Sequence, residues 1–182
     1  MKASPLTIAD VLLIEPQVFV DGRGFFFESF NQRQLETVVG RLAHFVQDNH
    51  SRSIKHVLRG LHYQIGRPQA KLIQVIVGEV FDVVVDIRRR SPTFGKWAGV
   101  MLSGEEKRQV WVPEGFAHGF VVTSDVAEVL YKTTDYWAPE YERCIAWDDP
   151  TLNIDWRLNG SMPVLSQQDR CGVAWDQAET YD

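Results

Sequence analysis

Short runs of apolar, β-branched and aromatic residues alternate with turn-forming residues along most of the chain. Runs of this length at near-regular spacing are typical of a sandwich or barrel of strands rather than of a sheet built with crossover helices. We therefore expect a mainly all-β fold with a single domain over residues 1–182. The runs predict strands at Val11–Val20, Gly24–Phe30, Ala70–Val77, Val80–Ile87, Gln109–Val112, Gly119–Thr123 and Ala127–Thr133.

Two segments carry helix signals instead. Residues Gln32–Val39 are predicted to be helical, because Asn31 is suited to the N-cap and Gly40 stands just past the end. A second, short helical turn is expected to begin near Ser166.

Three polar residues fall in phase with apolar neighbours in the predicted strands. Side chains on one face of a strand recur at every second position, so each of these residues shares a face with branched apolar residues. They are Lys71 in residues 71–77, Asp82 in residues 80–86 and Tyr131 in residues 129–133. Alternation alone leaves open whether these faces line an interior or lie at a solvated edge.

Composition limits the possible partners. The 182 residues include 19 basic and 24 acidic ones, for a formal charge of -5, so the chain lacks the basic footprint of a nucleic-acid-binding protein. Cys144 and Cys171 lack the spacing of a disulfide framework and are expected to be free thiols. No run approaches the roughly 18 apolar residues of a membrane span, and no signal peptide is visible. We expect a cytoplasmic protein that binds neither membrane nor nucleic acid.

The sequence contains half of a metal-binding cupin pattern. The segment PEGFAH at residues 113–118 fits its PxGxxH half. Metal-binding cupins combine this half with an HxH segment and a following glutamate, so that several N and O ligands converge on one ion. Here the corresponding segment, GLHYQ at residues 60–64, has a glutamine in place of the second histidine. We therefore expect no metal.

His62 is the strongest candidate for a catalytic group. Imidazole titrates near neutrality and is the usual general base. Arg59 lies three residues away, and on a regular strand the two side chains would face opposite sides. If both serve one site, the strand must contain a bend or a bulge. The chain has no dinucleotide fingerprint, phosphate loop or nucleophile elbow to favour another enzyme class.

Six motifs, in order, make the chain similar to the dTDP-4-dehydrorhamnose 3,5-epimerase family between about Val11 and Asp169. They are DGRGFFFESF at 21–30, FVQDNHS at 45–51, VLRGLHYQ at 57–64, GEVFDVVVD at 78–86, PEGFAHGF at 113–120 and YKTT at 131–134. The resemblance implies a cupin-type jelly-roll barrel with a few short helices, a homodimer, and neither a metal nor a redox cofactor.

The resemblance also implies a reaction. It is epimerisation at carbons 3 and 5 of dTDP-4-keto-6-deoxy-D-glucose, through enolate intermediates, to dTDP-4-keto-L-rhamnose in dTDP-L-rhamnose biosynthesis. The alternatives are a related 3- or 5-monoepimerase or ketoisomerase that acts on another dTDP-sugar, and a non-catalytic sugar-binding cupin. Tyr131 favours the double epimerase, because inversion needs a proton donor on the face opposite the base.

By this resemblance, His62 is the base, Asp169 orients it, Tyr131 is the acid and Lys71 stabilises the enolate. The substrate-binding positions that the resemblance implies are Gln47, Asn49, Arg59, His118, Trp137 and Glu142, with Arg23, Phe26 and Glu28 reaching the neighbouring subunit's site in a dimer that exchanges its N-terminal segments. Trp137 stands where the family stacks an aromatic residue, usually tyrosine, on the thymine. Gln168 replaces a lysine that many relatives use to bind the nucleotide, and Arg170 is a candidate substitute.

Overall fold

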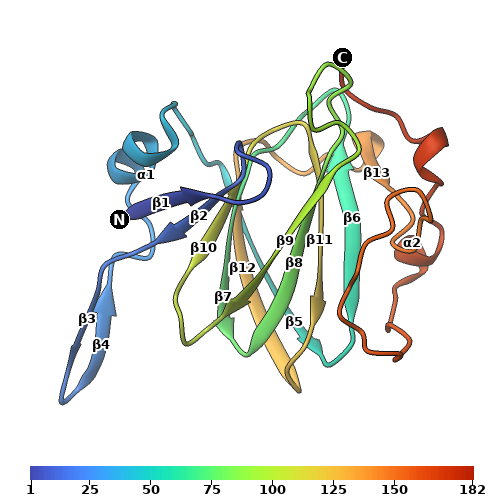
Figure 1. Cartoon of the computed structure of the whole chain (residues 1–182). Helices are drawn as coiled ribbons and strands as arrows, with labels where there is room; N and C mark the ends of the chain where they lie inside the picture. The colour runs from blue at the N-terminus through green and yellow to red at the C-terminus, as the bar shows by residue number, and fades with distance from the viewer.

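The computed structural model describes all 182 residues, which form two facing β-sheets with helices and a C-terminal segment outside them (Figure 1). In spatial order, the six-stranded sheet contains β1 (Lys2–Pro5), β2 (Leu12–Glu15), β10 (Gln109–Val112), β7 (Lys71–Val77), β12 (Val126–Thr133) and β5 (Gln47–Ile54). The five-stranded sheet contains β13 (Glu142–Cys144), β6 (Leu58–Gln64), β11 (Phe116–Val122), β8 (Glu79–Asp86) and β9 (Trp97–Ser103). The fold is the expected mainly all-β, cupin-type jelly roll.

The main core lies between the two sheets, and it explains the apolar alternation of the central strands. On β7, Ile73 and Val75 are fully buried in this core, where they meet Val84 of β8. Leu72 points to the other side of the sheet and packs beneath Leu35 of helix α1 (Gln32–Val39). Both faces of β7 are therefore covered, which is why its sequence is apolar at nearly every position. Burial of each such side chain contributes about 1.5–3 kcal/mol.

The C-terminal third covers the outer face of the five-stranded sheet. Ile145, Leu152 and Trp156 are buried there against Leu61 and Val83. Three short helical elements lie in the chain after β12: η1 (Pro139–Tyr141), α2 (Gln167–Arg170) and η2 (Trp175–Gln177). This packing fixes α2 beside β6, where it reaches the functional site (Figure 1).

Both predicted helices are confirmed. The Asn31 side chain accepts a hydrogen bond from the backbone N–H of Gln34 at the start of α1, and Gly40 ends this helix in the left-handed conformation, with φ of 72°. Helix α2 begins after Ser166, which forms a capping box with Asp169.

The predicted strands differ from the structure at the N-terminus. The run Val11–Val20 divides at Pro16 into β2 and β3 (Val18–Asp21), and the run Gly24–Phe30 is shortened to β4 (Gly24–Phe27). β3 and β4 pair only with each other, as a hairpin that projects away from the barrel (Figure 1). Five strands that the apolar runs did not predict are β1, β5, β6, β9 and β13. No helix has the length and apolar character that crossing a membrane requires.

Candidate active site

A cavity of about 320 Å³ lies between the two sheets, within the size range of small-molecule sites. Its walls are mainly polar, in contrast to the apolar core beside it. It is lined by Gln47, Asn49, Ser51, Arg59, His62, Tyr63, Gln64, Gln69, Lys71, His118, Phe120, Tyr131, Thr133, Trp137, Glu142 and Gln168. Nine of the thirteen residues predicted from the sequence are in this lining; the exceptions are Asp169, Arg23, Phe26 and Glu28.

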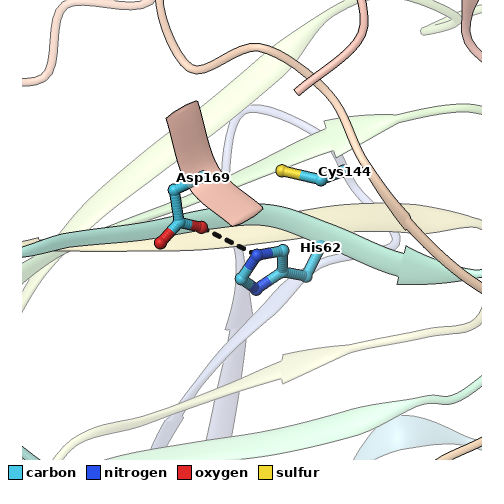
Figure 2. Close-up of side chains that lie close together, drawn as sticks. All are labelled: His62, Cys144 and Asp169. Carbon is cyan, nitrogen blue, oxygen red and sulfur yellow. Dashed lines mark ion pairs between the residues drawn. The ribbon is translucent and has the colours of Figure 1, made fainter. Parts of the chain in front are cut away.

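His62 and Asp169 form a close pair at the wall made by β6 and α2 (Figure 2). Nε2 of His62 lies 2.8 Å from Oδ1 of Asp169, although the approach is off the line of a regular hydrogen bond. Asp169 is only 3% exposed and also accepts hydrogen bonds from the Gly60 backbone N–H at 2.9 Å and the Ser166 hydroxyl at 2.6 Å. Burial by itself would raise the pKa of Asp169, but these contacts, with that of His62 the largest, lower the pKa to about 2. The carboxylate is therefore charged at neutral pH and holds the imidazole in place.

A bulge in β6 brings Arg59 and His62 to the same cavity. His62 pairs with His118 of β11, but Arg59 pairs with Phe120, so β6 contains one more residue than β11 over this stretch. Gly60 allows the bulge: its φ is 118°, and a Cβ there would lie 2.6 Å from the carbonyl oxygen of His118. The bend that the sequence required is thus present, and only glycine fits at its centre.

Lys71 and Tyr131 reach the cavity from the opposite sheet, on β7 and β12. Alternation left open whether the strand faces that carry Lys71 and Tyr131 are interior or solvated, and the structure shows that they are interior. Burial lowers the pKa of Lys71 to about 8, although the negative charges of Asp82 and Glu142 act against this. Burial raises the pKa of Tyr131, an effect that the positive charge of Arg59 partly offsets. At neutral pH Tyr131 is a phenol that can donate a proton, and most Lys71 side chains are cationic.

His118 and Asp82 form a second buried histidine–carboxylate pair. Nε2 of His118 lies 2.8 Å from Oδ2 of Asp82, and both residues lie on neighbouring strands of the five-stranded sheet. Alternation placed Asp82 on an apolar face, but the sequence did not pair it with His118, because the two residues are 36 positions apart. Their adjacency follows from the register of β8 and β11.

Gln47, Trp137 and Glu142 form the rim of the cavity. Gln47 donates to Asn49 at 2.9 Å and accepts from the backbone N–H of Trp137 at 3.0 Å. The indole N–H of Trp137 donates to Glu142 at 3.3 Å, while the side chain is 57% exposed. An exposed indole held at a cavity mouth offers a flat surface for stacking. Gln168 also lines the cavity, whereas Arg170 does not.

The remaining predicted residues lie on the N-terminal hairpin and the segment after it, away from this cavity. Arg23 pairs with Asp21 at 2.7 Å, and Phe26 is 68% exposed. Glu28 accepts from Asn31 at 3.1 Å and from Gln34 at 2.7 Å. Within one chain these residues do not meet the other site residues.

A potential metal-ligand cluster involves Cys144. Its Sγ and ligand atoms of His62 and Asp169 lie within 4.8 Å of one another (Figure 2). Burial raises the pKa of the Cys144 thiol to about 12, so the sulfur carries its proton at neutral pH.

Several lining residues were not singled out by sequence reasoning. Ser51, Gln64, Gln69, Phe120 and Thr133 belong to this group. Period-two alternation could have found Ser51 and Thr133, since each shares a strand face with a predicted site residue, Asn49 or Tyr131. Ser51 has a buried hydroxyl with no hydrogen-bond partner.

Comparison with known proteins identifies close relatives. A family model described as dTDP-4-dehydrorhamnose 3,5-epimerase matches residues 5–177. The dTDP-4-dehydrorhamnose 3,5-epimerase of Pseudomonas aeruginosa is 62% identical over 181 residues, which span 100% of this chain and 99% of that protein.

Two solved structures of sugar-nucleotide epimerases are also similar to this chain. The dTDP-6-deoxy-D-glucose-3,5-epimerase of Legionella pneumophila, in complex with dTDP-4-keto-L-rhamnose, is 51% identical with a TM-score of 0.94; the match covers 98% of this chain and 94% of that one. ChmJ, a 3'-monoepimerase from Streptomyces bikiniensis in complex with dTDP-quinovose, is 32% identical with a TM-score of 0.88, over 96% of this chain and 87% of that one.

Proposed function

Because the chain belongs to the dTDP-4-dehydrorhamnose 3,5-epimerase family, we propose that His62, Lys71 and Tyr131 carry out the family's reaction in the cavity between the sheets. The reaction is epimerisation at carbons 3 and 5 of dTDP-4-keto-6-deoxy-D-glucose, which yields dTDP-4-keto-L-rhamnose.

One observation carries the assignment of roles: the base and the acid come from opposite sheets. His62 lies on β6 of the five-stranded sheet, whereas Tyr131 lies on β12 of the six-stranded sheet, and both line one cavity. A sugar ring bound between the sheets has one of these groups on each face. Inversion of a carbon needs removal of a proton from one face and return of a proton to the other, which this placement provides.

The chemistry of the substrate ketone explains the roles of Lys71 and Asp169. The carbonyl at carbon 4 acidifies the hydrogens on carbons 3 and 5, and neutral His62 removes one of them. The electron pair of the broken C–H bond then forms an enolate, whose negative oxygen the Lys71 ammonium stabilises in a largely water-excluded site. The phenol of Tyr131 returns a proton to carbon from the opposite face, while Asp169 stabilises the imidazolium. Each step is a proton transfer, so the mechanism needs no electron carrier.

The rim residues bind the nucleotide in this proposal. Trp137 stacks on the thymine, and Arg59, His118, Gln47, Asn49 and Glu142 hold polar groups of the substrate. Gln168 lines the cavity where many relatives carry a lysine, so it contributes a neutral contact rather than a charge. A cytoplasmic location belongs to the same proposal, and the two free cysteines, Cys144 and Cys171, support it.

We also propose that the active form is a homodimer in which the β3–β4 hairpin completes the partner's site. Phe19, Phe25 and Phe26 are each more than half exposed on this hairpin, an unfavourable arrangement for an isolated chain. Strand β5 is the edge strand of the six-stranded sheet and lines the cavity with Gln47 and Asn49. A hairpin from a second chain that pairs with this free edge would cover its own aromatic residues and bring Arg23 and Glu28 toward the cavity.

The test of the reaction is incubation with dTDP-4-keto-6-deoxyglucose in deuterated water. We expect one deuterium at carbon 3 and one at carbon 5, with inversion at both carbons detected by NMR. The similarity to a 3'-monoepimerase makes the main alternative concrete. Inversion at carbon 3 alone would assign the chain to that narrower activity.

A further inference from the structure

The side chains of His62, Cys144 and Asp169 combine three kinds of ligand atom at one point of the site wall (Figure 2). We propose that they form an inhibitory binding site for a soft divalent cation, Zn²⁺. This site differs from the cupin metal pattern, because neither Cys144 nor Asp169 belongs to that pattern.

Two structural elements hold the ligands together. Cys144 of β13 pairs directly with His62 of β6, and residues paired in this way project from the same face of a sheet. Asp169 is fixed from the other side by α2, where the capping box with Ser166 orients its carboxylate. The cluster therefore results from strand register and helix capping rather than from mobile surface side chains.

The ligand chemistry and geometry fit zinc. Zn²⁺ binds cysteine sulfur, histidine nitrogen and carboxylate oxygen, and sites with three protein ligands leave a fourth position for water. With bonds of about 2.0–2.3 Å, tetrahedral ligand atoms lie roughly 3.3–3.8 Å apart, so the observed limit of 4.8 Å requires closure by about 1 Å. The proposal therefore requires the Cys144 sulfur to move inward, by rotation about its Cα–Cβ bond, and the 2.8 Å gap between His62 and Asp169 to widen by about 0.5 Å.

The geometry of the His62 contact supports the site. Nε2 of His62 is buried and lies 2.8 Å from Oδ1 of Asp169 without forming a regular hydrogen bond, so zinc would replace an ion pair rather than a well-aligned hydrogen bond. The Asp169 carboxylate supplies one negative charge, and Cys144 supplies a second as its proton passes to water when the Zn–S bond forms. Two anionic ligands balance the charge of the ion in a largely buried position.

Inhibition follows from occupation of the imidazole. A zinc ion on the His62 ring draws electron density from it and separates it from Asp169, so the ring no longer accepts a proton from carbon. This consequence rests on the proposed role of His62 as base, whereas metal binding itself does not.

The experiment combines a spectroscopic and a kinetic measurement on the full-length protein treated with EDTA. We expect the treated protein to keep full turnover, to lose activity on addition of Zn²⁺, and to recover when EDTA is added again. Mg²⁺ at equal concentration controls for metal bound to the substrate diphosphate and should leave the rate unchanged, because a hard cation prefers oxygen ligands. Addition of Co²⁺ should give a thiolate-to-cobalt charge-transfer band.

Two cysteine variants make the test specific. Cys144→Ser should lose the cobalt band and require ~10-fold or more Zn²⁺ for half inhibition, measured against its own uninhibited rate. Cys171→Ser, which alters the exposed second thiol, should behave as the wild type. A cobalt band that survives in Cys144→Ser, or inhibition equal in both variants, would overturn the site.

Two further outcomes distinguish a failure of the zinc site from a failure of the proposed role of His62 as the base. If Co²⁺ shows the Cys144-dependent band while saturating Zn²⁺ leaves turnover unchanged, the inhibitory role is overturned and His62 is not the base. If no metal binds, the zinc site alone is overturned, because deuterium exchange tests the epimerase mechanism independently.

Discussion

Individual side chains at this site depend on neighbours that are distant in the sequence. Asp169 stays ionised although it is almost fully buried, because Gly60, Ser166 and His62 all contact its carboxylate. A buried carboxylate without these partners would favour its neutral form. The ionised Asp169 carboxylate can therefore stabilise a positive charge on His62, and in the proposed mechanism the loss of either residue should affect the same step.

The first prediction concerns this pair. His62→Ala should abolish solvent deuterium exchange at both carbons, since in the proposed mechanism one base serves both. Asp169→Asn should lower turnover by about 10²–10⁴-fold, the range for a general acid–base contribution, while the substrate still binds. Single-turnover kinetics and NMR of the recovered substrate measure both effects. Fast exchange at either carbon in His62→Ala would reveal a second base.

Tyr131 should give a different signature from His62. Tyr131→Phe removes the donor on the opposite face but leaves His62 able to take a proton, so we expect exchange with retention, or slow and incomplete inversion at carbon 5. The measurement is the stereochemistry and deuterium content of the product over time. A normal rate of fully inverted product from this variant would contradict the assignment.

The third prediction uses the depressed pKa of Lys71, about 8. In the proposed mechanism the cationic form stabilises the enolate, so kcat/KM should fall as the pH rises through about 8, where the ammonium loses its proton. In Lys71→Arg, a guanidinium that stays charged should abolish this alkaline limb, even if the rate is lower throughout. Persistence of the limb at the same pH in the arginine variant would assign it to another group.

At the scale of the element, the bulge of β6 decides whether Arg59 and His62 can serve one cavity. A regular strand would turn one of them away, and the bulge exists because Gly60 combines a positive φ with close backbone contact to β11. A strand irregularity beside a catalytic residue is a common way to redirect a side chain.

Gly60→Ala tests this element. The added Cβ would lie 2.6 Å from the His118 carbonyl oxygen, so we expect a loss of about 2–4 kcal/mol in the free energy of unfolding, from backbone strain and overpacking, together with lower turnover. Urea unfolding provides the measurement. Gly22→Ala is the control, because no atom lies within 4 Å of its added Cβ. Equal stability of the two variants would show that the bulge does not need glycine.

At the scale of the whole molecule, the site is built between layers. The five-stranded sheet supplies His62 and Arg59, the six-stranded sheet supplies Lys71 and Tyr131, and the C-terminal segment supplies Asp169. The β3–β4 hairpin projects away from both sheets and contributes no side chain to the cavity of its own chain (Figure 1). Because the hairpin lies away from the cavity of its own chain, we expect it to reach the cavity of a second chain.

Mixing two inactive chains tests the shared site. An Arg23→Ala/Glu28→Ala chain combined with a His62→Ala chain should recover activity, because a heterodimer contains one site with His62 from the first chain and the hairpin of the second. Subunit exchange is verified with differently tagged chains before activity is measured. With exchange established, activity no higher than that of the separate mutants would mean that each chain completes its own site.

Local sequence patterns were sufficient to predict the elements whose formation depends mainly on residues close together in the chain. The caps at Asn31 and Gly40 determined α1, and alternation correctly placed Lys71 and Tyr131 in phase with core residues. Strand β5 escaped prediction because its face toward the cavity is polar, as a binding surface must be, so it lacks the apolar alternation of an ordinary strand. The division of Val11–Val20 at Pro16 was also readable in principle, since proline interrupts a strand.

The sequence by itself thus determined which residue types were available, the elements with strong local signals, and, through six ordered motifs, the family. Only the tertiary structure decided which groups meet. The resemblance implied that Asp169 orients His62, but the 2.8 Å contact between these residues, 107 positions apart, is seen only in the structure, and the pairing of Asp82 with His118 depends on the register of two strands. Local propensity contains no information on such distances, because register and layer packing arise from the burial of the whole core.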